Sequence, residues 1–122
     1  MYGDNKFVMV RRMSYEIEYY SAAVQGEIDT LPKGLRVRYG LLTARMENYG
    51  ANLGEPHTQA MGDGLFELRI KAAEGIARVF FCTLVRQRIV MLHSFVKKTQ
   101  KTPAKELRLA ETRMKELKDA NA

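Results

Sequence analysis

Hydrophobic residues in the first half of the chain recur every three or four positions, which is the period of an amphipathic helix. A short first helix is predicted after Ser21, because serine commonly caps helix N-termini. Its apolar positions are Val24, Ile28 and Leu31. A longer second helix is predicted between Pro32 and Gly50, which suit a first helical turn and a C-terminal cap. Its apolar seam consists of Leu35, Tyr39, Leu42, Met46 and Tyr49.

The second half of the chain changes to the period of a β-strand. Three such runs are joined by short connections, which predicts antiparallel hairpins. The runs are residues 65–71, 76–85 and 88–96. Alternation in the first run places its charged residues on one face, and these are Glu67, Arg69 and Lys71. In the second run, Arg78 and Phe80 share the face opposite Phe81, and we expect one of the two phenylalanines to be in the core and the other at the surface.

Further elements are predicted on both sides of these runs. Residues 15–19 alternate apolar and acidic side chains, as a half-buried strand does. Residues 50–64 are rich in Gly, Asn, Pro and Asp and are interpreted as a loop. Thr102 and Pro103 mark the start of a C-terminal helix, with Thr102 as its expected N-cap. The apolar stripe of this helix is Leu107, Ala110, Met114 and Leu117.

These elements predict an α+β fold with the order β-α-α-β-β-β-α. We expect the helical hairpin to cover one face of a twisted three-stranded antiparallel meander, with the basic face opposite it. Residues 1–13 are interpreted as an N-terminal extension and residues 14–122 as a single domain. The composition agrees, because 122 residues with 46% hydrophobic and 28% charged side chains suit one globular domain.

The chain carries one cysteine, Cys82, inside an apolar run. Its expected role is that of a small buried hydrophobe, and the low cysteine content suits a reducing compartment. No apolar run approaches the length of a bilayer span, and the N-terminus lacks the basic-then-apolar order of a signal peptide. We therefore expect a cytoplasmic protein without a membrane partner.

The positive charge is concentrated in one third of the chain. Residues 65–101 hold eight basic side chains and two acidic ones, which accounts for the whole formal net charge of +6. The basic residues are Arg69, Lys71, Arg78, Arg86, Arg88, Lys97, Lys98 and Lys101. A cationic field confined to one region predicts a polyanionic partner.

Four blocks of sequence carry a resemblance to a known family. They read Leu-Gly-Glu-Pro-His at 53–57, Gly-Asp-Gly-Leu-Phe-Glu-Leu-Arg at 62–69, Arg-Val-Phe-Phe at 78–81, and His-Ser-Phe-Val-Lys-Lys-Thr-Gln-Lys-Thr-Pro at 93–103. With a helical hairpin followed by a basic meander, these blocks resemble the RelE/ParE superfamily of type II toxin–antitoxin toxins, in its phage-derived HigB-like branch. The resemblance covers about residues 14–119 and implies the RelE-like fold.

The resemblance implies a ribosome-dependent mRNA endonuclease that inhibits translation by acting on mRNA in the ribosomal A site. It also implies a helix-turn-helix antitoxin, and a toxin–antitoxin heterotetramer that binds operator DNA. RelE-type members cut RNA without metal, when the 2′-hydroxyl attacks the adjacent phosphate. Such a reaction needs a base, an acid and fixed positive charge. We expect no cofactor or metal, because the histidines and the cysteine lack ligand spacing and no carboxylate pair is evident.

By this resemblance, the expected catalytic residues are Arg78, Lys98, Arg69 and His93. Arg78 is matched to the arginine of the family's Arg-Val-Phe strand and is expected to stabilise the phosphorane. A structural ion pair with Glu67 is the alternative for Arg78, and a pair with Glu67 or Glu74 is the alternative for Arg69.

The expected RNA-binding residues are Lys71, Lys97, Lys101 and Thr99. For the lysines near the last helix, a solvated surface is the alternative. His93 is a candidate acid or base that we expect to share a strand face with Met91 and Phe95, and a packed structural histidine is its alternative. His57, in the predicted loop, is a weaker candidate for proton transfer.

Two other functions are compatible with the same residues. One is a ParE-like toxin that binds DNA gyrase, and the other is a non-enzymatic phage-derived binding protein. The sequence leaves open the codon preference, the oligomeric state and the identities of the acid and the base.

Overall fold

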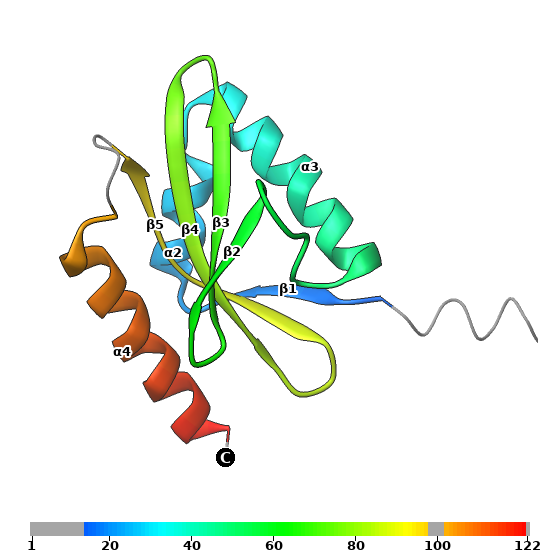
Figure 1. The fold of residues 1–122 in the computed structure, drawn as a ribbon, viewed down its shortest axis with the longest axis vertical. Coiled ribbons are helices and arrows are strands. Elements are labelled where there is room, and N and C mark those ends of the chain that lie inside the picture. The colour runs from blue at the N-terminus through cyan, green and yellow to red at the C-terminus, as the bar shows by residue number, and fades with distance from the viewer. Residues whose placement is uncertain (1–13, 98–101, 122) are drawn as a thin grey trace, which may run out of the picture.

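The computed structural model describes residues 14–97 and 102–121. They form one five-stranded sheet of order β1-β5-β4-β3-β2, with α2 and α3 on one face and α4 on the other (Figure 1). The elements are β1 Glu16–Tyr19, α2 Ala22–Asp29, α3 Lys33–Tyr49, β2 Thr58–Gly62, β3 Leu65–Ala72, β4 Gly75–Leu84, β5 Arg88–Lys97 and α4 Ala104–Ala120. This architecture confirms the predicted α+β class.

The sheet contains the expected antiparallel meander of β3, β4 and β5 and two additional edge strands. The predicted N-terminal strand is β1, which pairs parallel to β5. The interpretation of residues 50–64 as a loop was wrong in part, because β2 pairs antiparallel with β3. Glycine and polar residues hide this short strand in the sequence, whereas backbone pairing to β3 stabilises it in the fold.

The face covered by α2 and α3 carries the larger apolar core. The Ser21 hydroxyl accepts a hydrogen bond from the Val24 amide at 3.2 Å and caps α2 as predicted. Gly50 ends α3 with a φ of 105°, a conformation that favours glycine. The fully buried members of this core are Leu35, Leu42, Met46, Leu68, Ile70, Ala77, Val79, Phe81, Ile89 and Met91.

The opposite face is half apolar, because α4 lies across one end of it (Figure 1). Ala110 and Met114 of α4 pack against a cluster that contains Phe80, Leu92 and Cys82. The expectation of one core and one surface phenylalanine was therefore wrong: Phe80 and Phe81 are both 0% exposed, one on each face of the sheet. The face opposite the helical hairpin is basic only in part, because α4 covers its apolar cluster while Arg69 and Arg78 line a pocket. In the part of the chain that is described, no helix is long and apolar enough to cross a membrane.

A β-bulge in β5 changes which side chains share a face. Phe80 pairs with His93, whereas Phe81 pairs with Met91, so that Leu92 is the extra residue. Met91 consequently lies in the core under α2 and α3, and His93 lies on the α4 face, where its ring stacks on Phe95. The expectation that His93 and Met91 share a face was wrong for this reason.

Candidate functional site

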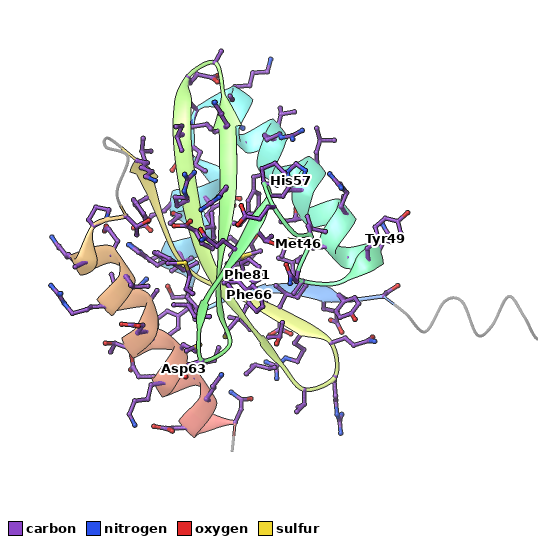
Figure 2. All side chains as sticks on the ribbon, viewed as in Figure 1. Met46, Tyr49, His57, Asp63, Phe66 and Phe81 are labelled. Carbon is purple, nitrogen blue, oxygen red and sulfur yellow. The ribbon has the colours of Figure 1, made fainter. Side chains whose placement is uncertain are left out.

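A pocket of about 680 Å³ opens at the end of the sheet that α4 leaves free. Four of its lining side chains are basic, and they come from α3, β3 and β4. The lining residues are Arg38, Pro56, His57, Arg69, Lys71, Ile76 and Arg78. The pocket therefore combines predicted candidates with residues from the first half of the chain, and Figure 2 shows His57 beside α3. Its charge suits a phosphate-bearing ligand.

Strand register places two arginines of the pocket side by side. Arg69 in β3 and Arg78 in β4 are direct cross-strand partners, and Lys71 follows on the same face of β3. Like charges directly opposite each other destabilise a sheet unless an opposite charge lies nearby. The arrangement therefore requires a compensating carboxylate.

Glu67 supplies that carboxylate from β3. Its side chain is 2% exposed, and its Oε1 lies 3.3 Å from Arg69 Nε and 3.5 Å from Arg78 Nε. Its Oε2 accepts a hydrogen bond from the Thr102 hydroxyl at 3.0 Å. The prediction that Thr102 caps α4 was wrong, because Pro103 occupies the N-cap position without a side-chain bond and the Thr102 hydroxyl is bonded to Glu67 instead.

Arg69 is committed to contacts within the protein through all three of its nitrogens. Besides Nε on Glu67, Nη1 lies 3.0 Å from Glu55 Oε1 and Nη2 donates to Gln59 Oε1. The structural alternative for Arg69 is thus present in this structure, with Glu67 as the partner. Glu74 instead accepts the Gly34 amide at 2.8 Å. Arg69 lines the pocket, but its hydrogen-bonding capacity is used to hold β2, β3 and the preceding loop together.

Arg78 has more donor capacity left than Arg69. Its Nε faces Glu67, and its Nη1 makes a long contact of 3.5 Å with the Ala77 carbonyl; its Nη2 donates to no residue that the structure describes. Its side chain is 12% exposed. Burial lowers the pKa of Arg78, Arg69 acts in the same direction, and Glu67 opposes both. A guanidinium remains charged under such conditions, so Arg78 presents a fixed cation to the pocket.

Lys97 extends the cationic cluster from the end of β5. It pairs with Ile76, a residue of the pocket wall. Its pKa is lowered by burial first and then by Arg78, whereas Glu67 raises it. Lys97 is therefore within electrostatic reach of the arginine pair. Lys98, Thr99 and Lys101 lie outside the described residues, and their predicted roles stay predictions.

The two histidines occupy different environments. His93 is 8% exposed, and its Nε2 lies 3.1 Å from Glu106 Oε1 of α4. Its buried Nδ1 has no hydrogen-bond partner among the described residues. His93 thus connects β5 to α4 and does not line the pocket. His57 does line it and is the histidine better placed for proton transfer.

His57 lies beside two arginines of α3. Its Nε2 is 3.5 Å from Arg45 Nη1, and its pKa is lowered by burial first and then by Arg45 and Arg38. Its imidazole is therefore neutral at pH 7 and able to accept a proton. The sequence does not single out Arg38 as a site residue, because it lies in the helical half of the chain, remote from the charged strands. The spacing of Arg38 and Arg45, one heptad apart on α3, is the signal that could have indicated a basic helix face.

Among residues 14–97 and 102–121, no group of three or more His, Cys, Asp or Glu side chains is arranged to hold a metal ion. Cys82 is buried in the core beneath α4, where burial raises the pKa of its thiol. The titratable side chains that line the pocket are cations and one imidazole.

Comparison with solved structures first defines the class of fold. The chain is similar to the E. coli toxin RelE, solved as a double arginine mutant in the free state, with a TM-score of 0.63 and 9% sequence identity. The match covers 84% of this chain and 99% of that chain. At this identity the likeness shows the fold alone, and it confirms the predicted RelE-like architecture.

Comparison with protein families then gives the family. The family described as "Phage derived protein Gp49-like (DUF891)" matches residues 26–115. The protein belongs to this phage-derived Gp49-like family. Its RelE-like fold agrees with the expected relation to the RelE superfamily. Assignment to the HigB-like branch stays a prediction. No curated protein matches the sequence.

Proposed function

We propose that this protein is the toxin of a type II toxin–antitoxin system and inhibits translation by cutting mRNA on the ribosome. The observation that supports this most directly is the pocket in which Arg38, Arg69, Lys71 and Arg78 converge on a RelE-like fold. A cationic cavity of about 680 Å³ suits a phosphodiester and its flanking nucleotides. The proposed reaction transfers the phosphoryl group from the 5′-oxygen to the 2′-oxygen within the RNA strand and needs no cofactor.

In this reaction the 2′-oxygen bonds to the adjacent phosphorus while the bond to the 5′-oxygen breaks. The 2′-hydroxyl proton passes to a base, and the departing 5′-oxygen receives a proton from an acid. Negative charge grows on the phosphorane oxygens, and fixed donors that face this charge lower the barrier. Arg78 is the proposed donor, because its Nη2 is not used by any described residue of the protein.

His57 is the proposed base of the site. A neutral imidazole accepts a proton at pH 7, and the pKa of His57 is lowered by its surroundings. Lys97 supplies further positive charge, and its lowered pKa makes its ammonium a better proton donor than an ordinary lysine. Lys71, Lys98, Lys101 and Thr99 are proposed to hold neighbouring phosphates. His93 is assigned no proton transfer in this scheme.

The proposal includes the partners that the toxin class implies. A cognate helix-turn-helix antitoxin would silence the toxin in the cytoplasm and form with it a heterotetramer on operator DNA. The ribosomal A site would hold the mRNA. Correct positioning by the ribosome contributes to the rate because it removes the entropic barrier to an in-line geometry.

The test is cleavage of mRNA on programmed ribosomes by the full chain and by Arg78→Ala. We expect the variant to cut at least about 100-fold more slowly, in line with the loss of one donor to a developing oxyanion. Arg88→Ala is the matched control, because Arg88 pairs with Glu18 at 2.8 Å and does not line the pocket. Equal cutting by wild type and Arg78→Ala would contradict the role of Arg78.

Intact mRNA in the presence of wild-type protein would contradict the nuclease proposal itself. If DNA breaks that depend on gyrase then appear, the ParE-like function is the correct one. If neither RNA nor DNA is damaged and growth is normal, the chain is a non-enzymatic binding protein.

A further inference from the structure

Glu67 forms ion pairs with two arginines of the pocket and is an unusual residue to find beside an anion-binding site. It is a carboxylate, it is 2% exposed, and it belongs to the strand that carries Arg69 and Lys71. Burying a charge is unfavourable unless the charge is paired and hydrogen-bonded. Glu67 meets this condition with three partners from three elements or their flanks, Arg69, Arg78 and Thr102.

We propose that Glu67 is a positioning residue for the reaction assigned to this pocket: it holds the guanidinium of Arg78 by its Nε edge and so directs the remaining donors at the scissile phosphate. This inference rests on the proposed function. Glu67 itself touches no RNA, because the two arginines and Thr102 enclose its carboxylate.

Glu67 faces the same edge of both guanidinium groups. Both arginines face the same oxygen, Oε1, through their Nε atoms, at 3.3 Å for Arg69 and 3.5 Å for Arg78. The Arg69 contact is a hydrogen bond, whereas the Arg78 contact is an ion pair in which Nε makes no hydrogen bond to a described residue. An arginine held by its Nε edge keeps its terminal nitrogens available for a second acceptor. Arg69 uses those nitrogens on Glu55 and Gln59, whereas Nη2 of Arg78 has no acceptor among the described residues. The contact with Glu67 therefore orients Arg78 without consuming its binding capacity.

The negative charge of Glu67 also compensates the positive charges around it. Burial is the main cause that lowers the pKa of Arg78 and of Lys97; Arg69 adds to it and Glu67 opposes it. Together with its ion pairs to Arg69 and Arg78, this makes Glu67 the counter-charge of the cluster. Without it, the cations would repel one another and Arg78 would turn toward solvent. Because a misplacement of about 1 Å can slow a reaction about 100-fold, the orientation of Arg78 is expected to affect the rate more than the affinity for RNA.

Thr102 holds the Glu67 carboxylate by a hydrogen bond. Its hydroxyl binds the other oxygen, Oε2, immediately before the start of α4. This bond fixes the carboxylate oxygen of Glu67 that the arginines do not contact. Thr102→Val keeps the side-chain volume and removes the hydroxyl, so it tests the same positioning from a second direction.

Glu67→Gln is the decisive variant because it is isosteric. The amide oxygen of glutamine can replace Oε1 beside the arginines, and its NH₂ group can donate to the Thr102 oxygen in place of Oε2. The variant therefore keeps the packing and removes the negative charge. Glu74→Gln is the matched control: it removes the same charge from the β3–β4 connection, and its amide oxygen still accepts the Gly34 amide.

Three quantities are measured for wild type, Glu67→Gln, Thr102→Val and Glu74→Gln. They are the single-turnover rate of cutting on ribosomes, the Kd for an RNA with 2′-O-methyl groups that cannot be cut, and the order of the Arg78 Nε–Hε group in ¹⁵N-edited NMR spectra. We expect Glu67→Gln to cut about tenfold or more slowly, to bind the RNA equally or more tightly, and to lose order at Arg78. Thr102→Val should lose rate and order to a smaller extent, and Glu74→Gln should match wild type.

Two results would overturn the inference. One is an unchanged rate for Glu67→Gln, and the other is a fall in rate matched by an equal loss of RNA binding, which indicates a merely structural role. If wild-type protein cuts no RNA, the proposed function fails by itself. The NMR measurement then still decides the role of Glu67, because an ordered Arg78 Nε–Hε group in Glu67→Gln would contradict it.

Discussion

The two faces of the sheet differ in how completely a helical layer covers them. On one face, the helices α2 and α3 cover the sheet (Figure 1) and bury the larger apolar core against it. On the other, α4 contributes only two buried residues among those described, Ala110 and Met114, and the strands beyond it carry Glu67, Arg69 and Arg78. The first face stabilises the fold, and the uncovered end of the second is free to hold a charged ligand. In this chain the candidate site lies where the covering helix ends.

The faces also differ in how they satisfy polar groups. The helical hairpin requires few polar contacts with the sheet, although Tyr39 Oη lies 2.9 Å from Tyr19 Oη beneath α3. By contrast, α4 is attached by a series of polar contacts that includes Glu106 with His93 and Arg113 with the Leu92 carbonyl at 2.8 Å. Such contacts contribute less stability than apolar burial because they replace bonds to water.

The largest effect is expected from truncating one apolar residue on each helical layer. Leu35→Ala, in α3, should lower the free energy of unfolding by about 2–5 kcal/mol because Leu35 is 0% exposed. Met114→Ala, in α4, should lower it less because Met114 is 8% exposed. Urea denaturation measures both. Hydrogen exchange should show that Met114→Ala affects mainly α4, and an equal loss of protection throughout the sheet would contradict the proposed difference between the faces.

The next effect concerns the two histidines and the pH dependence of cutting. The pKa of His57 is lowered, so His57 is neutral above its ordinary pKa of about 6.5 and becomes protonated only at more acidic pH. The rate should therefore be level near pH 7 and fall on acidification below about pH 6.5. His57→Asn should cut about 10–100-fold more slowly. Its rate should also lack the fall at acidic pH, which is the acid limb of the pH profile.

His93→Asn is the matched control for that measurement. His93 is bonded to Glu106 outside the pocket, so its replacement should leave the acid limb in place. An acid limb that survives in His57→Asn and disappears in His93→Asn would reverse the assignment.

A smaller effect is expected from the arginine that α3 contributes to the pocket. Arg38→Gln should weaken binding of uncleavable RNA and reduce the slope of log Kd against log salt by about 0.7, the value for one phosphate contact on a single strand. Arg36→Gln carries the same change on the same helix, but Arg36 donates to the Leu31 carbonyl at 2.8 Å and does not line the pocket. Equal slopes for both variants would place the RNA elsewhere.

The smallest effect is expected at the end of the sheet farthest from the pocket. Gln87, in the β4–β5 connection, has a φ of 61°, which favours glycine. Gln87→Gly should raise the free energy of unfolding by about 0.5–1 kcal/mol in urea denaturation. The rate of RNA cutting should not change, because this connection lies at the opposite end of β4 from Arg78. A lower free energy of unfolding for Gln87→Gly would show that contacts of the Gln87 side chain stabilise the fold by more than the backbone strain destabilises it.

Most of the fold could be predicted because periodicity reports local structure well. The apolar seam predicts α3, and its positions from Leu35 to Met46 are buried, whereas the last predicted position, Tyr49, is 80% exposed. The alternation of β3 predicts that Glu67 and Arg69 share a face. The strand β2 could not be predicted, since its five residues gain their stability from pairing with β3. The bulge at Leu92 is likewise a product of register, and it reverses the expected face of His93.

The site was predictable only in its strand residues. Arg69, Lys71 and Arg78 belong to one charged stretch, and the structure brings them into one pocket. Arg38 and His57 enter that pocket through tertiary packing, for which the sequence has no periodic signal. The double attachment of Glu67 depends on Thr102, and no local pattern joins two residues that are 35 positions apart.

The measurement that tests the central claim most directly is mapping of mRNA 5′ ends after brief expression of the chain in bacteria. The proposed function predicts new 5′ ends within coding sequences during expression of wild-type protein and far fewer with Arg78→Ala at the same protein level. Unchanged 5′ ends with wild-type protein, whether growth is normal or DNA is broken, would contradict it.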